Sequence, residues 1–214
     1  MTKNKFHLIL IIIFLTTSCR NKAQEHFKEG NSKFNKHNYS GALLEYTNAI
    51  ELDSNFIEAI YWRGKANYEL KNYNDAIIDY NKACNLNNNY KDAIYDRGCA
   101  KFESKDYKGA IEDFSKSISL SSKDTYSFHI YVMLTLSKIN INDYRGAIEE
   151  CSNLIKKYPR DPLGYRLIGI AKINLGDKFG GCCDFKKAIE LGDSKTDEIS
   201  QLIHNTEATL TKNQ

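Results

Sequence analysis

Apolar residues recur every three or four positions along most of the chain, in short stretches that polar turns separate. Residues 59–70 and 74–86 form one pair of such stretches, and Lys71, Asn72 and Tyr73 lie between them. This spacing places apolar side chains on one face of a helix. The pattern therefore predicts two helices joined by a tight turn, which is a helical hairpin.

The hairpin pattern returns with a period of 34 residues in four sets of positions. A turn tyrosine is followed three residues later by an alanine, at Tyr39 and Ala42, Tyr73 and Ala76, Tyr107 and Ala110, and Tyr144 and Ala147. Glycines recur at Gly30, Gly64, Gly98 and Gly169. The other two sets are Tyr46, Tyr80, Phe114, Cys151 and Phe185, and Ala49, Ala83, Ser117, Leu154 and Ala188. All four sets share one three-residue insertion before the fourth repeat, so they belong to a single repeating unit.

A glycine inside a helix costs about 1 kcal/mol relative to alanine, so its recurrence indicates a close approach of the second helix. This small residue, the aromatic residue at the turn and the alanines of the second helix resemble the tetratricopeptide repeat. The resemblance covers five repeats, at residues 23–56, 57–90, 91–124, 128–161 and 162–195. It implies an all-α solenoid in which helical hairpins stack into a right-handed superhelix. Thr135 replaces the glycine in the fourth repeat, and Gly181 replaces the alanine in the fifth.

The C-terminal residues 196–214 are predicted to cap the last hairpin. The stretch Asp197–Thr209 is amphipathic, and its apolar residues are Ile199, Leu202, Ile203 and, just beyond, Leu210. A stacked array needs a polar terminal surface, and an amphipathic helix over the last hairpin would supply it.

The N-terminal residues have the layout of a secretory signal. Lys3 and Lys5 precede an apolar run from Leu8 to Leu15, and small polar residues lead to Cys19. The run is too short for a membrane-spanning helix, which needs roughly 20 apolar residues. The segment Leu15–Cys19 resembles a bacterial lipobox, which implies that residues 1–18 are removed and that Cys19 carries lipid.

By that resemblance, residues 19–22 form a lipid-attachment tether that anchors the protein in the bacterial envelope. Arg20 follows the cysteine, and by the enterobacterial sorting rule this favours the outer membrane. The alternative is an ordinary signal peptide, which would leave a soluble periplasmic or secreted protein.

The repeat family binds ligands on a concave wall made by the first helix of each hairpin. In the second repeat the matching positions are Glu58, Tyr61, Lys65, Tyr68 and Glu69, and in the third they are Asp92, Tyr95, Cys99, Phe102 and Glu103. The aromatic residues of this wall either bind a peptide or pack between hairpins. In the last two repeats the wall is apolar, at Val132, Leu136, Ile139, Leu163, Ile170 and Ile173, which indicates a binding slot or a seat for the C-terminal helix.

Two pairs of charged residues occupy the same positions in the second and third repeats. Arg63 and Asp79, and Arg97 and Asp113, are each sixteen residues apart, on the first and second helix of their hairpin. We expect intra-repeat ion pairs, with solvated charges as the alternative.

Charge and composition exclude several classes of function. The formal net charge is +3, from 30 basic and 27 acidic side chains of interspersed sign, so the basic stripe needed for nucleic acid is missing. His26, His37, His129 and His204 do not converge by spacing, so neither a metal nor a catalytic site is proposed, and no cofactor is expected. Phe27 and Trp62 replace the Lys and Asn of the chaperone-binding subset, although Asn31 matches it.

Five cysteines remain besides Cys19, at Cys84, Cys99, Cys151, Cys182 and Cys183, and their positions suit small buried side chains. The sequence therefore predicts a non-catalytic scaffold that binds a protein or peptide at the bacterial envelope. A redox or enzyme-accessory protein that uses an exposed thiol is the alternative, and it would need a cysteine of low pKa.

Overall fold

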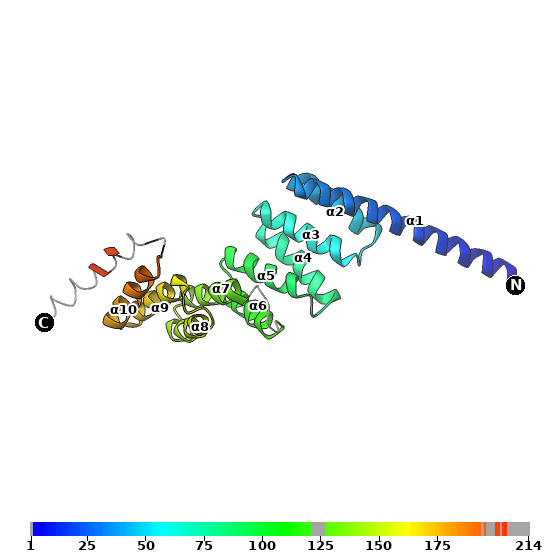
Figure 1. Ribbon diagram of the computed structural model, residues 1–214. Coiled ribbons are helices and arrows are strands. Elements are labelled where there is room, and N and C mark those ends of the chain that lie inside the picture. The colour runs from blue at the N-terminus through cyan, green and yellow to red at the C-terminus, as the bar shows by residue number, and fades with distance from the viewer. Residues whose placement is uncertain (1, 121–126, 194, 196–199, 202, 205–214) are drawn as a thin grey trace. The chain divides into compact units, whose positions relative to one another are not determined.

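The computed structural model describes residues 2–120, 127–193, 195, 200, 201, 203 and 204, with side chains from Cys19 onward except that of Ser127. This part of the chain contains ten α-helices and no strand (Figure 1). The helices are α1 Thr2–Asn35, α2 Tyr39–Leu52, α3 Ile57–Glu69, α4 Tyr73–Leu86, α5 Lys91–Glu103, α6 Tyr107–Leu120, α7 Ser127–Asn140, α8 Tyr144–Lys157, α9 Pro162–Leu175 and α10 Lys178–Glu190. Each of the five predicted repeats holds two of them.

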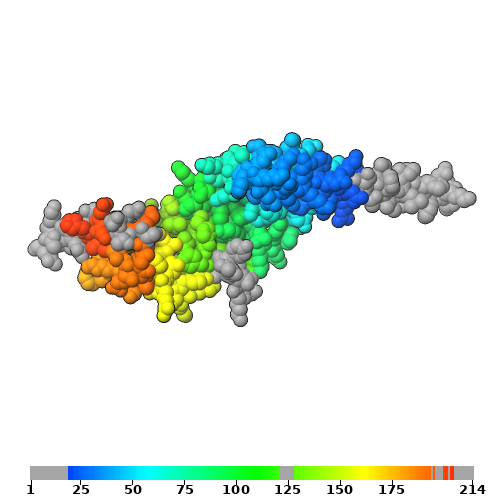
Figure 2. Space-filling view, turned by 45° about the horizontal axis from the view of Figure 1, so that its top comes forward, coloured from blue at the N-terminus to red at the C-terminus, as the bar shows by residue number. Residues whose placement is uncertain are grey.

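The chain divides into two compact units, Met1–Ser104 and Lys105–Gln214. In the first unit α1 packs on α2, α2 on α3, α3 on α4 and α4 on α5, and α1 and α5 both contact α3. The first helices of the hairpins therefore form one layer, α1, α3 and α5, which we call the helix-A face. In the second unit each helix from α6 to α10 packs on the next. Figure 2 shows α1 from Cys19 onward and α2 as one continuous blue surface.

The turn inside each hairpin has the same backbone geometry in all five repeats. The residue two before the second helix adopts a positive φ, between 58° and 101°, at His37, Lys71, Lys105, Asn142 and Gly176. Only the fifth is a glycine, although this region favours glycine. The next residue is Asn or Asp, and its side chain accepts a hydrogen bond from the helix in four repeats, as Asp143 does from the Gly146 amide at 3.0 Å. These caps fix where the second helix begins in those four repeats.

The repeated glycines make room for the repeated aromatic rings. A Cβ on Gly30 would lie 2.6 Å from Tyr46 Cε1, and a Cβ on Gly169 would lie 2.7 Å from Phe185 Cδ1. The close approach predicted from the sequence is therefore present, and its cause is the ring. In the fourth repeat Thr135 and Cys151 take these two places, and both are fully buried.

Ion pairs join the two helices of the hairpins. Asp79 accepts from Arg63, with Nη2 2.6 Å from Oδ1, so the structure brings this predicted pair together. The first, fourth and fifth repeats use a lysine twelve residues before the acid, in the pairs Lys33–Glu45 at 2.6 Å, Lys138–Glu150 at 2.7 Å and Lys172–Asp184 at 2.7 Å. The acidic residue directly precedes the repeated ring, or Cys151 in its place in the fourth repeat. The sequence analysis did not predict these lysine–acid pairs.

The apolar wall of the last two repeats is packed. Val132 is buried with Cys151, Leu154, Leu167 and Ile168, and Leu136, Ile139 and Leu163 pack against this cluster. Ile170 and Ile173 pack against Cys182, Phe185, Ala188 and Ile203. Ile203 comes from the predicted capping segment, so that segment contacts the last hairpin as a seat would require. The other apolar residues of the predicted cap, Ile199, Leu202 and Leu210, lie outside the described residues.

Helix α1 runs without a break through Cys19 into the first hairpin. The Cys19 side chain is exposed. Along the described part of the chain, every helix is too short or too polar to cross a bilayer.

Candidate functional site

The predicted binding residues lie on α3 and α5 in the helix-A face. Glu58 and Asp92 are exposed, at the first turn of α3 and of α5 respectively. The side chains of Lys65, Tyr68, Tyr95 and Phe102 are half-buried. Tyr61 is 7% exposed, so it offers almost no surface to a ligand.

Tyr61 packs between neighbouring hairpins. Its hydroxyl donates a hydrogen bond to Asp96 Oδ2 at 2.7 Å, and its ring lies 5.0 Å from Tyr90 and 5.9 Å from Tyr80. Burial raises the pKa of the Tyr61 hydroxyl well above its ordinary value, with a further contribution from Asp96. Of the two alternatives for the wall aromatics, the packing role holds for Tyr61.

Lys65 and Tyr68 are also held by neighbours. The Lys65 ammonium lies 3.7 Å from Asp96 Oδ2 and 5.3 Å from the centre of the Trp62 ring. The Tyr68 ring meets the Tyr73 ring edge-on, with 5.5 Å between centroids. These contacts order the middle of the helix-A face.

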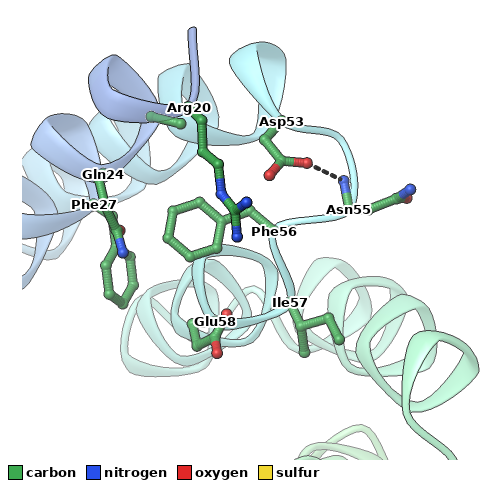
Figure 3. A pocket seen from close by; sticks show the side chains of 9 residues that line it. Arg20, Gln24, Phe27, Asp53, Asn55, Phe56, Ile57 and Glu58 are labelled. Carbon is green, nitrogen blue, oxygen red and sulfur yellow. Dashed lines mark hydrogen bonds between the residues drawn. The ribbon is translucent and has the colours of Figure 1, made fainter. Parts of the chain in front are cut away.

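A cavity of about 340 Å³ opens at the N-terminal edge of this face, where α1 meets the loop before α3 (Figure 3). Its apolar wall comes from Phe27, Phe56 and Ile57. Its polar lining is Arg20, Gln24, Asp53, Asn55 and Glu58. In Figure 3 the Arg20 side chain extends from α1 to the ring of Phe56, and Asp53 accepts a hydrogen bond from the Asn55 amide at 3.1 Å.

The sequence analysis found Glu58 but missed the other residues of this cavity. Phe56 and Tyr90 are the last residues of the first two repeats and are 34 positions apart, so the period could have revealed them. Phe56 stacks on Phe27 and Tyr90 on Tyr61, each with 5.0 Å between ring centroids. A pair of packed rings therefore occurs twice along this edge, and we call each pair an aromatic step. The first step is Phe27–Phe56 and the second is Tyr61–Tyr90.

The second predicted ion pair has one member in each unit. In the first unit Arg97 Nη1 donates to Asn81 Oδ1 at 2.8 Å. Asp113 lies in the second unit, where it is buried. The Arg97–Asp113 pair stays a prediction.

Comparison with known proteins identifies the repeating unit. Sequence models described as tetratricopeptide repeat match residues 57–90 and 92–124, and one described as TPR repeat matches residues 30–71. The chain contains tetratricopeptide repeats. The match over 57–90 has the same bounds as the second predicted repeat.

Solved structures of TPR proteins share the fold. A crystal structure of MamA protein has 26% identity and a TM-score of 0.74, over 82% of this chain and 94% of that one. YrrB, described as a TPR protein with an unusual peptide-binding site, has 17% identity and a TM-score of 0.73, over 86% and 90%. The first TPR of Spaghetti (RPAP3), bound to the HSP90 peptide SRMEEVD, has 24% identity and a TM-score of 0.54, over 57% and 94%. Among curated proteins no sequence matches.

Two positions of the TPR helix-A face are aromatic here and engaged in packing. Phe27 contacts the rings of Tyr46 and Phe56, and Trp62 meets Phe34 edge-on at 5.2 Å. Asn31 accepts a hydrogen bond from the Tyr46 hydroxyl at 2.8 Å. Phe27 and Asn31 therefore pack within the first hairpin, and Trp62 packs α3 against it.

The cysteines of the repeats are mostly in packing positions. Cys84, Cys151 and Cys182 are buried, Cys99 is half-buried, and Cys183 is exposed. Burial raises the pKa of the Cys99 and Cys151 thiols to about 12. A thiol with a raised pKa is a poor nucleophile, so neither cysteine suits redox chemistry. Within the described residues, no three His, Cys, Asp or Glu side chains gather in a way that could hold a metal ion.

Proposed function

We propose that the protein is a non-catalytic scaffold that binds a protein or peptide segment on its helix-A face. The cavity at the edge of this face carries the proposal, because it combines an apolar wall with polar groups that fix a ligand's orientation. Two proteins of the same fold support it: one is described with a peptide-binding site and one is bound to a peptide.

The binding surface we propose includes the accessible predicted residues Glu58, Lys65, Tyr68, Asp92 and, beyond them, Tyr95 and Phe102. Glu58 and Asp92 are exposed and would contact the ligand directly. Half-buried aromatic side chains present flat surfaces that lose little entropy on binding. Tyr61 would act beneath them, as the residue that holds two hairpins together.

Site-specific photo-crosslinking tests this proposal. Benzoylphenylalanine would be placed at Asp92 or Phe102 on the helix-A face, and at Leu44 or Ile78 as controls. The controls lie on α2 and α4 and are 57% and 62% exposed. We expect one dominant crosslinked partner in intact cells from the first two positions only. Crosslinks from the control positions alone would move the binding surface to the second helices and overturn the proposal.

We also propose that Cys19 is lipidated and anchors the scaffold to the bacterial envelope, most simply at the outer membrane. The lipobox-like residues Leu15–Cys19 support this, and so does the exposed position of the Cys19 side chain. Two acyl chains on one residue give durable anchoring, because each buried methylene contributes about 0.8 kcal/mol.

Mass spectrometry of the mature protein tests the anchor. An acylated N-terminal Cys19 is expected, and Cys19→Ala should release the protein from the membrane fraction. A mature chain without lipid would instead support the soluble periplasmic or secreted form. A thiol-reactivity profile tests the redox alternative, with Cys183 as the cysteine to follow because it is exposed.

A further inference from the structure

The two aromatic steps at the edge of the helix-A face carry acidic groups on their accessible side. Glu58 lies beside the first step, Phe27–Phe56, and lines the cavity there. Asp92 is its equivalent 34 residues later, beside the second step, Tyr61–Tyr90. Both carboxylates are exposed, so neither is consumed by the packing of the repeats.

The half-buried Tyr90 is the N-cap residue of α5, two residues before Asp92. Its ring lies 5.0 Å from that of Tyr61, which follows Glu58 by one turn of α3. Burial raises the pKa of the Tyr90 hydroxyl to about 12, and the charges of Asp92, Glu58 and Asp96 raise it further. Each of these neighbouring charges is negative. An aromatic ring with carboxylates in its neighbourhood attracts a cation through both the ring face and the charges.

One basic side chain on the same face, that of Lys65, already has partners. Lys65 lies 3.7 Å from Asp96 and over the rings of Tyr61 and Trp62. Asp96 also accepts a hydrogen bond from the Tyr61 hydroxyl, so Lys65, Asp96 and Tyr61 interact with one another. Arg20 lines the cavity together with Glu58 and Asp53, whereas Asp92 lies outside that lining.

We propose that this edge selects peptides that carry a lysine or arginine. The basic side chain would lie on Tyr90 between Glu58 and Asp92, and a neighbouring apolar side chain would enter the cavity against Phe27 and Phe56. This inference rests on the proposed function, since it names the chemistry of the segment bound there. The occupant is a basic peptide segment of another protein, because the edge offers carboxylates and aromatic rings to it.

Selection from random twelve-residue peptides displayed on phage tests the inference, with the full chain purified in mild detergent as the target. We expect the enriched peptides to contain lysine or arginine next to an apolar residue. The most enriched peptide would then be synthesised with a fluorescent label, and its affinity measured by fluorescence anisotropy at low and high salt.

The decisive variant is Glu58→Gln/Asp92→Asn, which removes two charges from the edge and keeps the side-chain shapes. It should weaken binding roughly 3- to 10-fold, as expected for two accessible charge interactions, and the loss should shrink at high salt. The matched control is Glu69→Gln/Glu103→Gln, which removes two exposed charges from the far ends of α3 and α5. The control should stay within about twofold of the unsubstituted chain.

Each other result overturns a stated part of the proposal. Enriched peptides without basic residues, or an equal loss in both double variants, would refute the charge selection and leave the peptide-binding function in place. A dimer of the chain that the peptide dissociates would show that a second copy of the chain occupies this edge. That result would refute a partner protein as the occupant. Failure to enrich any peptide would contradict the proposed function itself.

Discussion

The ring of Tyr80 occupies the space that a side chain on Gly64 would need. A Cβ at Gly64 would lie 2.8 Å from Tyr80 Cε1 and 3.2 Å from Asp79 Cβ. Tyr80 is 1% exposed, so the ring has no room to move away. The glycine and the ring therefore form one packing unit that joins the two helices of a repeat.

Gly64→Ala should destabilise the protein by about 1–3 kcal/mol, because it adds volume to a filled core. Urea unfolding followed by circular dichroism measures the change. Gly41 in α2 is a helical glycine next to its own cap, Asn38, rather than a buried ring, so Gly41→Ala is the matched control and should cost less. An equal cost at both sites would contradict the packing account.

The fourth repeat predicts that the two members of this unit exchange together. Thr135 and Cys151 replace the glycine and the ring there, and both are fully buried. Thr135→Gly alone should leave a cavity and Cys151→Tyr alone should overpack the core. The double variant should be more stable than the sum of the two changes predicts, by about 1–3 kcal/mol in a double-mutant cycle. Additive losses would mean that the two positions do not share one space.

Lys71→Gly should stabilise the second hairpin by about 0.5–1 kcal/mol. Lys71 has a φ of 62°, which costs a residue with a Cβ more than it costs glycine. The reverse change at the same turn position of the fifth repeat, Gly176→Ala, should destabilise, because Gly176 has a φ of 101°. Thermal unfolding of both variants checks the two signs, and a destabilised Lys71→Gly would refute the strain argument.

Glu45→Gln should lower stability at neutral pH and lose its effect in acid. The Lys33 hydrogen bond and then His26 lower the pKa of the Glu45 carboxyl. A lowered pKa gives stability that is present above the unfolded-state value, about 4.3, and is lost as the pH falls through the folded-state value. Urea midpoints at pH 7 and pH 3 measure this. Glu29, which lies 3.1 Å from Lys33 but is largely exposed, supplies the control Glu29→Gln, which should change little.

Tyr61→Phe should destabilise the protein by about 1–2 kcal/mol at neutral pH, because Asp96 loses a hydrogen-bond donor. Burial raises the pKa of the Asp96 carboxyl, and the Tyr61 hydroxyl opposes that rise. Without the hydroxyl the pKa rises further, so the loss should be present at pH 7 and shrink as the pH falls and Asp96 binds a proton. A loss that is equal at pH 7 and pH 4 would assign the effect to ring packing instead.

The sequence predicted the hairpins and their boundaries because the period constrains every repeat at once. A single Gly64 or Tyr80 says little, but the same pair at 34-residue intervals indicates one geometry. The turn conformation escaped prediction because His, Lys, Lys and Asn stand where glycine would have signalled a positive φ. The helices on either side of the turn recur in every repeat, and they hold these four residues at a positive φ that such residues do not favour.

Predicting the binding surface was harder, since helical spacing places residues on a face but does not tell which are covered. Tyr61 and Glu58 lie three positions apart on α3, and one is buried while the other is exposed. The difference comes from Tyr90 and Asp96, which reach Tyr61 from the next repeat. Contacts of this kind depend on how repeats stack, and no pattern inside one repeat contains them.

The unbroken course of α1 has a geometric consequence for an anchored protein. With 1.5 Å of rise per residue, the eight residues from Cys19 to Phe27 span about 12 Å. A lipid on Cys19 would therefore hold the cavity a short distance above the bilayer, with no flexible linker between the lipid and the helix. The scaffold would sample only ligands that reach this thin layer, so membrane-bound partners would be met far more often than freely diffusing ones.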